Sequence, residues 1–238
     1  MPVPTFTVTC SRNTLIAPGI YECSFARPAA LSFQPGQFVL FDVPLVDAPS
    51  DIQTRALSIA STPTESELLF AVKLLKGGRM SRFVEEVLRP GTEVVIKGPF
   101  GFFVLHPENP KEYLFIATST GVAPFRAQIR HALEGGERRR IDLIYGVRSE
   151  EDLFWAEELT ALAQKYDNFF LHLALSNPSP SWTGHRGRVQ TLVPLIVRDF
   201  SRRHVYVCGS PAMTNELKTL CLQHWGIAKQ DLHVEGYI

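Results

Sequence analysis

Arg55 and Ser58, three residues apart in a β-forming run, carry side chains that could hold a phosphate and a redox-active ring together. A guanidinium can clamp a pyrophosphate through two parallel hydrogen bonds. A serine hydroxyl both donates and accepts, so it can serve a ring nitrogen in either protonation state. In an ideal strand the two side chains lie on opposite faces, so we expect a bent pleat here. The ordinary alternative is an edge arginine beside a solvated serine.

A glycine-rich turn follows at Gly77-Gly78-Arg79-Met80-Ser81, before a predicted helix. Glycines let the backbone approach a phosphate, and the free N–H groups at a helix start favour an anion. It is not a Walker loop, because no lysine follows the glycines in the required frame. An ordinary turn into a serine-capped helix is the alternative.

Two later turns each leave a predicted buried strand and enter a predicted helix. Ligands of doubly wound sheets lie beyond the carboxyl ends of strands, where both turns fall. The G-x-G-x-x-G dinucleotide fingerprint is absent, and a cysteine in such a turn could simply be a small core residue. Four signals of this kind would rarely coincide by accident. The two turns comprise Thr120, Gly121, Val122, Ala123 and Pro124, and Cys208, Gly209, Ser210, Pro211, Ala212 and Met213.

Two different patterns of predicted secondary structure position these motifs. Up to residue 105, six short β-forming runs predict a small antiparallel β-barrel, interrupted by one helix at Ser81–Leu88. After the Pro-rich stretch at 106–110, buried strands alternate with amphipathic helices, which predicts a doubly wound parallel sheet. The predicted domains are therefore 1–105 and 111–238. Ser149 and Asp152 resemble a capping box before the second helix of the later domain, whose apolar stripe begins at Trp155.

Composition excludes several other classes of protein. The 24 basic and 24 acidic residues create no global field for nucleic acid or an acidic membrane. No apolar run approaches the roughly 18 residues that a membrane helix needs, and the N-terminus lacks a signal-peptide pattern. The four cysteines form no C-x-x-C pair, so neither a metal site nor an iron–sulfur cluster is predicted, and reduced thiols favour a cytoplasmic location.

Together these motifs resemble the ferredoxin–NADP reductase superfamily over nearly the whole chain, and within it the reductase components of bacterial oxygenases. Members pair a flavin-binding barrel with a nicotinamide-binding domain. The resemblance implies FAD in preference to FMN, with Arg55 on its phosphate and Ser58 at N5. The other cofactor-binding residues that it implies are Ala56, Leu57, Val72, Lys73, Leu74, Gly78, Arg79, Met80 and Ser81 for the flavin, and Thr120, Gly121, Val122, Pro124, Cys208, Gly209, Pro211 and Met213 for NADH or NADPH.

The ending Glu235-Gly236-Tyr237-Ile238 resembles the terminal E-x-Y of the same family. The resemblance implies that Cys208 and Glu235 shape the nicotinamide pocket and that Tyr237 is a gate over the flavin face. A frayed terminus is the alternative for Tyr237.

Two positions depart from the family pattern. Leu57 stands where an aromatic residue is usual, so the flavin loses a ring contact worth about 0.5 to 1.5 kcal/mol beyond area burial. Asn177 follows Ser176, where phosphate-preferring relatives place an arginine, which favours NADH over NADPH. A substitute charge could come from Arg148, Arg186 or Arg188.

The implied activity is that of an NAD(P)H-dependent flavoprotein oxidoreductase, with Ser58, Cys208, Glu235 and Tyr237 as catalytic residues. Related reductases carry a fused iron–sulfur domain that this sequence lacks, so we expect a separate electron acceptor, such as a ferredoxin, another redox protein or a small molecule. Two alternatives remain open: a reductase of free flavin, and a non-catalytic flavin-binding subunit. No oligomeric state follows from these patterns.

Overall fold

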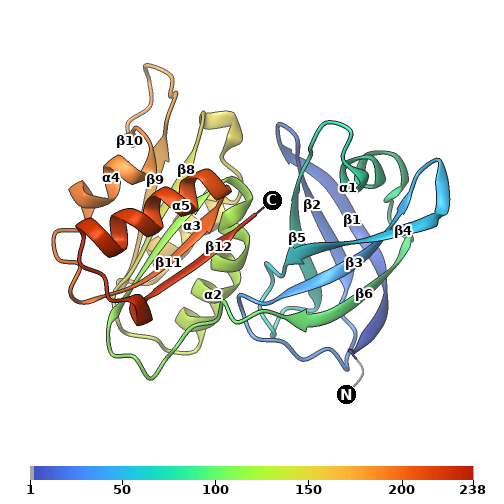
Figure 1. The fold of residues 1–238 in the computed structure, drawn as a ribbon, viewed down its shortest axis with the longest axis horizontal. Coiled ribbons are helices and arrows are strands. Elements are labelled where there is room, and N and C mark those ends of the chain that lie inside the picture. The colour runs from blue at the N-terminus through green and yellow to red at the C-terminus, as the bar shows by residue number, and fades with distance from the viewer. Residues whose placement is uncertain (1–2, 238) are drawn as a thin grey trace. The chain divides into compact units, whose positions relative to one another are not determined.

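The computed structural model describes residues 3–237, so Ile238 of the terminal motif lies outside it. The chain divides into two compact units, drawn in Figure 1. Unit 1 comprises Met1–Leu105 with Arg126–His131, and unit 2 comprises His106–Phe125 with Ala132–Ile238. No helix within the described residues is long and apolar enough to cross a membrane.

Unit 1 contains a curled antiparallel sheet of six strands, in the order β4-β3-β6-β1-β2-β5 (Figure 1). Its core is aromatic, since the Phe41 ring lies 4.9 Å from that of Phe70 and 5.4 Å from that of Phe25. This architecture confirms the predicted antiparallel barrel. The strands are β1 (Thr5–Ala17), β2 (Ile20–Ala26), β3 (Phe38–Leu45), β4 (Ala48–Ser58), β5 (Glu67–Lys73) and β6 (Glu93–Phe100).

The helix of unit 1 begins two residues earlier than expected. Helix α1 (Arg79–Arg82) starts directly after Gly78 and continues as a π-helical turn at Phe83–Val87. The wider turn closes where Leu88 N donates to Phe83 O over 2.8 Å. Strand β4 also begins well before the predicted Ala56, because its first half is exposed and polar and offers no apolar alternation to detect.

Unit 2 contains a parallel sheet in the order β10-β9-β8-β7-β11-β12, with helices on both faces, which confirms the doubly wound prediction. Helices α4 and α5 cover an aliphatic face that includes Ile116 and Val207, whereas Phe125 of α2 contacts Phe115 on the opposite face at 4.9 Å. The elements are β7 (Glu112–Thr118), β8 (Ile141–Val147), α3 (Ala156–Lys165), β9 (Phe169–Leu175), β10 (His185–Arg186), α4 (Val189–Ile196), β11 (Arg203–Gly209), α5 (Pro211–Thr219) and β12 (Leu232–Gly236), together with α2 (Ala123–Glu134), whose residues 126–131 belong to unit 1.

The segment between β8 and α3 differs from the sequence prediction. Ser149 and Asp152 do form the expected hydrogen bonds, with Asp152 Oδ2 accepting from Ser149 N at 3.0 Å and from Ser149 Oγ at 2.7 Å. They enclose a 3-10 turn at Glu150–Asp152, however, and α3 begins only at Ala156. Trp155, which the apolar stripe placed in the helix, precedes it with a φ of 57°. The periodicity could not show this left-handed residue.

Candidate flavin and nicotinamide sites

The register of β4 fixes where Arg55 and Ser58 lie. Strand β4 pairs with β3 without interruption from Ser58 to Ile52, so the bulge that could have bent the pleat between Arg55 and Ser58 is absent. A one-residue slip of β4 would move Leu57, which packs against the barrel core opposite Val39, to the other face of the sheet. The strand ends at Ser58 instead, and Ile59 N donates to Gln37 O over 3.0 Å. Ser58 is therefore buried at the turn that leaves the strand.

An open seam separates β4 from β5, the two edge strands of the curled sheet. The strands meet at one end, where Ala60 N donates to Leu69 O over 2.8 Å and Leu69 N donates to Ser61 Oγ over 3.1 Å. Beyond that closure no strand pairs with the outer edge of either within residues 3–237. Edge strands present backbone N–H and C=O groups to a ligand. The two predicted flavin segments, residues 55–58 and 72–74, lie on these two edges.

The guanidinium of Arg55 is held only by its own strand. It donates to Thr54 O over 2.7 Å and to Gln53 Oε1 over 3.1 Å, and no carboxylate within residues 3–237 pairs with it. Arg79, by contrast, is ion-paired to Asp51 Oδ2 at 2.9 Å with its side chain largely buried. Arg55 could therefore bind a phosphate without breaking an ion pair, whereas Arg79 would first have to break its ion pair with Asp51.

The glycine-rich turn presents backbone donors. Gly78 precedes α1 in an extended conformation, and no side chain within the described residues caps the helix. Ser81 does not cap it, because its Oγ accepts from Leu75 N over 2.7 Å. The first N–H groups of a helix have no partner inside the helix, so the turn offers donors suited to an anion.

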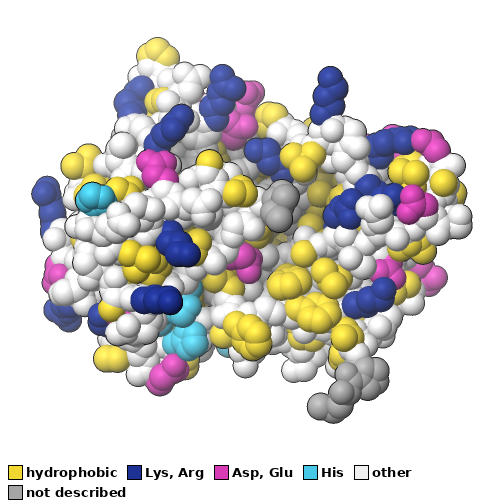
Figure 2. Space-filling model, in the orientation of Figure 1, with side chains coloured by type: hydrophobic (Ala, Val, Ile, Leu, Met, Phe, Trp, Pro, Cys, Tyr) yellow, Lys and Arg dark blue, Asp and Glu magenta, His cyan; other side chains and the backbone are white. Residues whose placement is uncertain are grey.

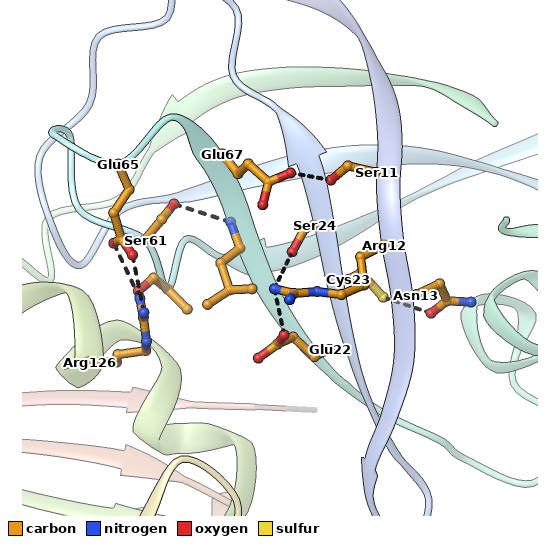
Figure 3. A network of polar contacts seen from close by, with 12 residues as sticks. Ser11, Arg12, Asn13, Glu22, Cys23, Ser24, Ser61, Glu65, Glu67 and Arg126 are labelled. Carbon is orange, nitrogen blue, oxygen red and sulfur yellow. Dashed lines mark hydrogen bonds and ion pairs between the residues drawn. The ribbon is translucent and has the colours of Figure 1, made fainter. Parts of the chain in front are cut away.

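A charged anchor holds the loop that follows Ser58. Figure 3 shows Arg126 and Glu65 pointing at each other within unit 1. Arg126 Nη2 lies 3.1 Å from Glu65 Oε1, Arg126 Nη1 donates to Ala60 O over 2.8 Å, and Thr62 N donates to Glu65 Oε2 over 2.6 Å. Burial raises the pKa of Glu65, but the hydrogen bond and charge of Arg126 outweigh it and hold that pKa below its usual value. The anchor fixes the chain two residues beyond Ser58.

In unit 2 the two predicted dinucleotide turns lie side by side at the point where the strand order reverses. Strands β7 and β11 are neighbours, and the turns follow their carboxyl ends. A Cβ on Gly121 would stand 2.3 Å from Cys208 O, and one on Gly209 would stand 2.2 Å from Thr118 Oγ1. Because neither glycine has a Cβ, the backbones of the two turns can pack closely against each other. Such reversal points are where doubly wound sheets bind ligands.

Three of the four predicted catalytic residues come together beside these turns. Cys208 and Glu235 are register partners on β11 and β12, and Tyr237 N donates to Gly209 O over 2.9 Å. Burial, followed by the charge of Glu235, raises the pKa of the Cys208 thiol well above its usual value, and Tyr237 opposes the shift. Cys208 is thus a protonated thiol at neutral pH, which excludes a thiolate nucleophile.

The loops after β8 and β9 are joined at the same sheet edge. Ser176 N donates to Val147 O over 3.1 Å, and Gly187 N donates to Leu175 O over 2.8 Å. Arg186 is committed to three backbone carbonyls, those of Ser179, Pro180 and Trp182. Arg148, whose carbonyl accepts from Asn177 N, and Arg188 are exposed, and their guanidinium groups have no hydrogen bond or ion pair within residues 3–237.

Sequence reasoning missed the residues that position the site. Arg126 and Glu65 lie 61 residues apart in the chain, and neither belongs to a recognisable motif. Thr118 is not among the predicted site residues, yet its hydroxyl lies against Gly209. For these residues no local pattern could have supplied the signal.

Two family models match the chain in the order of its units. The model described as the oxidoreductase FAD-binding domain matches residues 9–105, and the oxidoreductase NAD-binding domain matches residues 115–219. Ferredoxin–NADP reductase B of Sorangium cellulosum (strain So ce56) is 36% identical over 231 residues, which cover 93% of each chain.

Other relatives are longer proteins. The ferredoxin–NAD(P)(+) reductase component of the naphthalene 1,2-dioxygenase/salicylate 5-hydroxylase systems of Ralstonia sp. is 32% identical over 89% of this chain, which spans 62% of that relative. The reductase component DmpP of phenol 2-monooxygenase from Pseudomonas sp. (strain CF600) is 30% identical over 99% of this chain, which spans 66% of it.

Solved structures share the fold. The Amycolatopsis cytochrome P450 reductase GcoB superposes with a TM-score of 0.88 at 24% identity, covering 99% of this chain and 70% of that one. A ferredoxin NADP+ reductase from Neisseria gonorrhoeae superposes with a TM-score of 0.83 at 19% identity, covering 98% of both.

An FAD-binding and an NAD-binding domain in one chain define an NAD(P)H-dependent flavoprotein oxidoreductase. The chain belongs to the ferredoxin–NADP reductase family. The residues present fit these cofactors: unit 1 offers an open seam and uncapped helical N–H groups, and unit 2 offers two closely packed turns at the point of strand reversal.

Proposed function

We propose that this protein takes a hydride from NAD(P)H and passes two electrons, one at a time, to a separate redox protein of the ferredoxin type. The observation that carries the proposal is that Cys208, Glu235 and Tyr237 lie close together beside the two packed turns of unit 2. The other unit of the same chain has an open seam between β4 and β5. The relatives named as reductase components for oxygenases support a protein acceptor.

The chemistry that FAD supplies when bound is acceptance of a hydride and release of single electrons. Arg55 binds a phosphate of the cofactor, the turn at Gly78–Ser81 binds an anion through its N–H groups, and Ser58 hydrogen-bonds N5. The backbone of residues 56–57 and 72–74 borders the ring. These roles rest on the unopposed guanidinium of Arg55, the uncapped start of α1 and the position of both segments on the seam.

In unit 2 the residues orient the nicotinamide and exclude water. Thr120–Pro124 and Cys208–Met213 form the two walls, and the protonated Cys208 thiol and the Glu235 carboxylate border the ring. Tyr237, whose backbone N–H donates to Gly209 O, is the group that must move when the nicotinamide arrives. The proposal includes a cytoplasmic location, supported by four buried, unpaired cysteines.

The nucleotide preference depends on charge near Ser176. We propose that Arg148 and Arg188, which are exposed and have no acidic partner in the described residues, bind the 2'-phosphate of NADPH. The protein could then use NADPH even though position 177 is an asparagine and not an arginine. The Arg148→Ala/Arg188→Ala variant should lose at least about 10-fold in kcat/KM for NADPH, because each charged hydrogen bond is worth about 1.5 to 3 kcal/mol. Its kcat/KM for NADH should hold, and Arg198→Ala serves as the exposed control. Equal losses with both nucleotides would contradict the assignment.

The main proposal is tested with purified protein. It should be yellow, and its flavin absorbance should bleach when NADH or NADPH is added without oxygen. Reduced protein should then reduce an added ferredoxin. A protein that takes up no flavin on reconstitution would refute the proposal. Flavin that is lost on dialysis while NAD(P)H–flavin turnover persists would instead identify a free-flavin reductase.

A further inference from the structure

Two histidines on adjacent strands of unit 2 share a short contact. His204 on β11 and His233 on β12 approach with their Nε2 atoms 2.7 Å apart. A neutral imidazole carries one N–H, so this contact requires one ring to donate from Nε2 and the other to accept at an unprotonated Nε2. The pair is therefore compatible with one proton between the rings and not with two.

Burial makes a second proton costly. The His204 ring is almost fully buried, and its Nδ1 atom has no hydrogen-bond partner within the described residues. The His233 ring is stacked between two others, with the Tyr206 centroid at 4.6 Å and the His106 centroid at 5.0 Å. An imidazolium at His204 would leave a buried N–H without water or an acceptor. Histidine side chains visible in Figure 2 gather mainly in one patch of unit 2.

The charged groups around the pair largely offset one another. Asp231 is paired with Lys111 at 2.9 Å, and Glu108 with His106 at 3.1 Å. Arg139 lies over the Tyr113 ring, which in turn stacks on His204. Burial dominates: together with the neighbouring His233 it lowers the pKa of His204 to about 4, and together with His106 it lowers the pKa of His233.

A bound metal does not explain the contact. Two imidazole nitrogens on one tetrahedral zinc would lie roughly 3.3 Å apart, given Zn–N bonds of about 2.0 to 2.1 Å. Within residues 3–237, moreover, no three histidine, cysteine or acidic side chains are placed to hold a metal ion. The 2.7 Å separation is that of a hydrogen bond.

The pair lies on the two strands that carry the nicotinamide residues. Cys208 follows His204 on β11, and its register partner Glu235 follows His233 on β12. His233 is the register partner of Tyr206, so it contacts His204 diagonally across the two strands. Strand β12 is the sheet edge and pairs only with β11 in the described chain, and Leu232 and Val234 pack against the aliphatic core.

We propose that His204 and His233 form an acid-sensitive joint between β11 and β12. When both rings are protonated, their Nε2–H groups oppose each other, β12 loosens, and Glu235 and Tyr237 leave their positions. The effect on catalysis rests on the proposed function, but the effect on stability does not. Because the folded-state pKa of each ring is below its unfolded value of about 6.5, the contribution to stability is full above that pH and is lost as the pH falls toward 4.

The first experiment measures urea unfolding of the flavin-loaded protein between pH 7.5 and 5. For the wild type, His204 alone should lower the folding equilibrium constant by about 30-fold over this range. In His204→Gln the folding equilibrium constant should not show this fall, and in His233→Gln the fall should be smaller than in the wild type. His224→Gln, an exposed histidine in the same unit, should behave like the wild type. The pH dependence of stability that the other histidines cause should be the same in every variant. Identical pH dependence in the wild type and His204→Gln would overturn the joint.

Two further measurements complete the test. In the unmodified protein, an imidazole NMR titration should leave His204 neutral down to pH 5, and a midpoint near 6.5 would refute the proposal even if the variants do not fold. Flavin reduction by NAD(P)H should slow reversibly in acid for the wild type and not for His204→Gln. Parallel slowing would refute the link to Glu235 and Tyr237, whereas no reduction at any pH would refute the proposed function alone. A response to EDTA or added zinc would also overturn the joint.

Discussion

The two candidate sites are built in opposite ways. In unit 2, Gly121, Gly209 and Cys208 are packed so closely that a methyl group at either glycine would overlap a neighbour. In unit 1, the predicted flavin residues lie along the edges of two strands whose ends are joined by hydrogen bonds from Ala60 to Leu69 and from Leu69 to Ser61. The nicotinamide site is therefore shaped by the protein itself, whereas the flavin site is an open edge that a ligand completes. The difference suits a cofactor that stays and a cofactor that comes and goes.

The largest effect should come from removing the anchor behind the seam. Arg126→Ala should lower the free energy of unfolding by about 3 kcal/mol, because it removes the more buried of the two arginines that pair with Glu65 and leaves Arg130 as the remaining one. Urea unfolding at pH 7 measures this. The contribution of the pair is full above the unfolded pKa of Glu65 and should fade as the pH drops below it. Arg89→Ala is an exposed-loop control in the same unit, and equal losses would contradict the anchor.

Unit 2 should tolerate no side chain at its closest approach. In Gly121→Ala the added methyl meets the Cys208 carbonyl, so the turns separate and flavin reduction by NAD(P)H should slow on the order of 100-fold. Stopped-flow absorbance measures the rate, and flavin content should be unchanged. Gly226→Ala, which has open space around it, should keep the wild-type rate. A fast Gly121→Ala protein would show that the contact is dispensable.

Side chains on the seam should divide into binding and reactive roles. Arg55→Ala should weaken flavin binding by about 10- to 100-fold, because it removes a charged hydrogen bond to phosphate. Arg79→Ala should weaken it less, since Arg79 is already paired with Asp51. Ser58→Ala should keep the flavin and slow its reduction. Flavin titration and stopped flow distinguish the three, and the reverse ranking of Arg55 and Ser58 would exchange their roles.

A substitution at Leu57 should have the smallest effect on flavin binding. Leu57→Tyr should tighten flavin binding by about 0.5 to 1.5 kcal/mol if the side chain reaches the ring. Leu57 packs against the barrel core, however, on the same face as Val39. Flavin titration and urea unfolding of the variant therefore separate two outcomes. Lower stability with unchanged affinity would show that the residue belongs to the core alone, and Leu57→Met serves as the apolar control.

Sequence alone was most informative where burial is complete. Strands β7 and β11, buried along nearly their whole length, differ by one residue at either end or less from the apolar runs Tyr113–Thr118 and His204–Cys208, because buried parallel strands are continuous apolar runs. The exposed half of β4 carries no such signal. The motifs identified the turns of both sites, but their mutual packing and the Arg126–Glu65 anchor depend on tertiary contacts. The His204–His233 contact likewise follows only from strand order.

All four cysteines of this redox protein are buried. Burial raises the pKa of every one of them, to about 12 for Cys221. Peroxide and alkylating agents attack the thiolate, and a reduced flavin that meets oxygen is a source of peroxide. The four thiols are thus protected from oxidation for as long as the fold that buries them is intact.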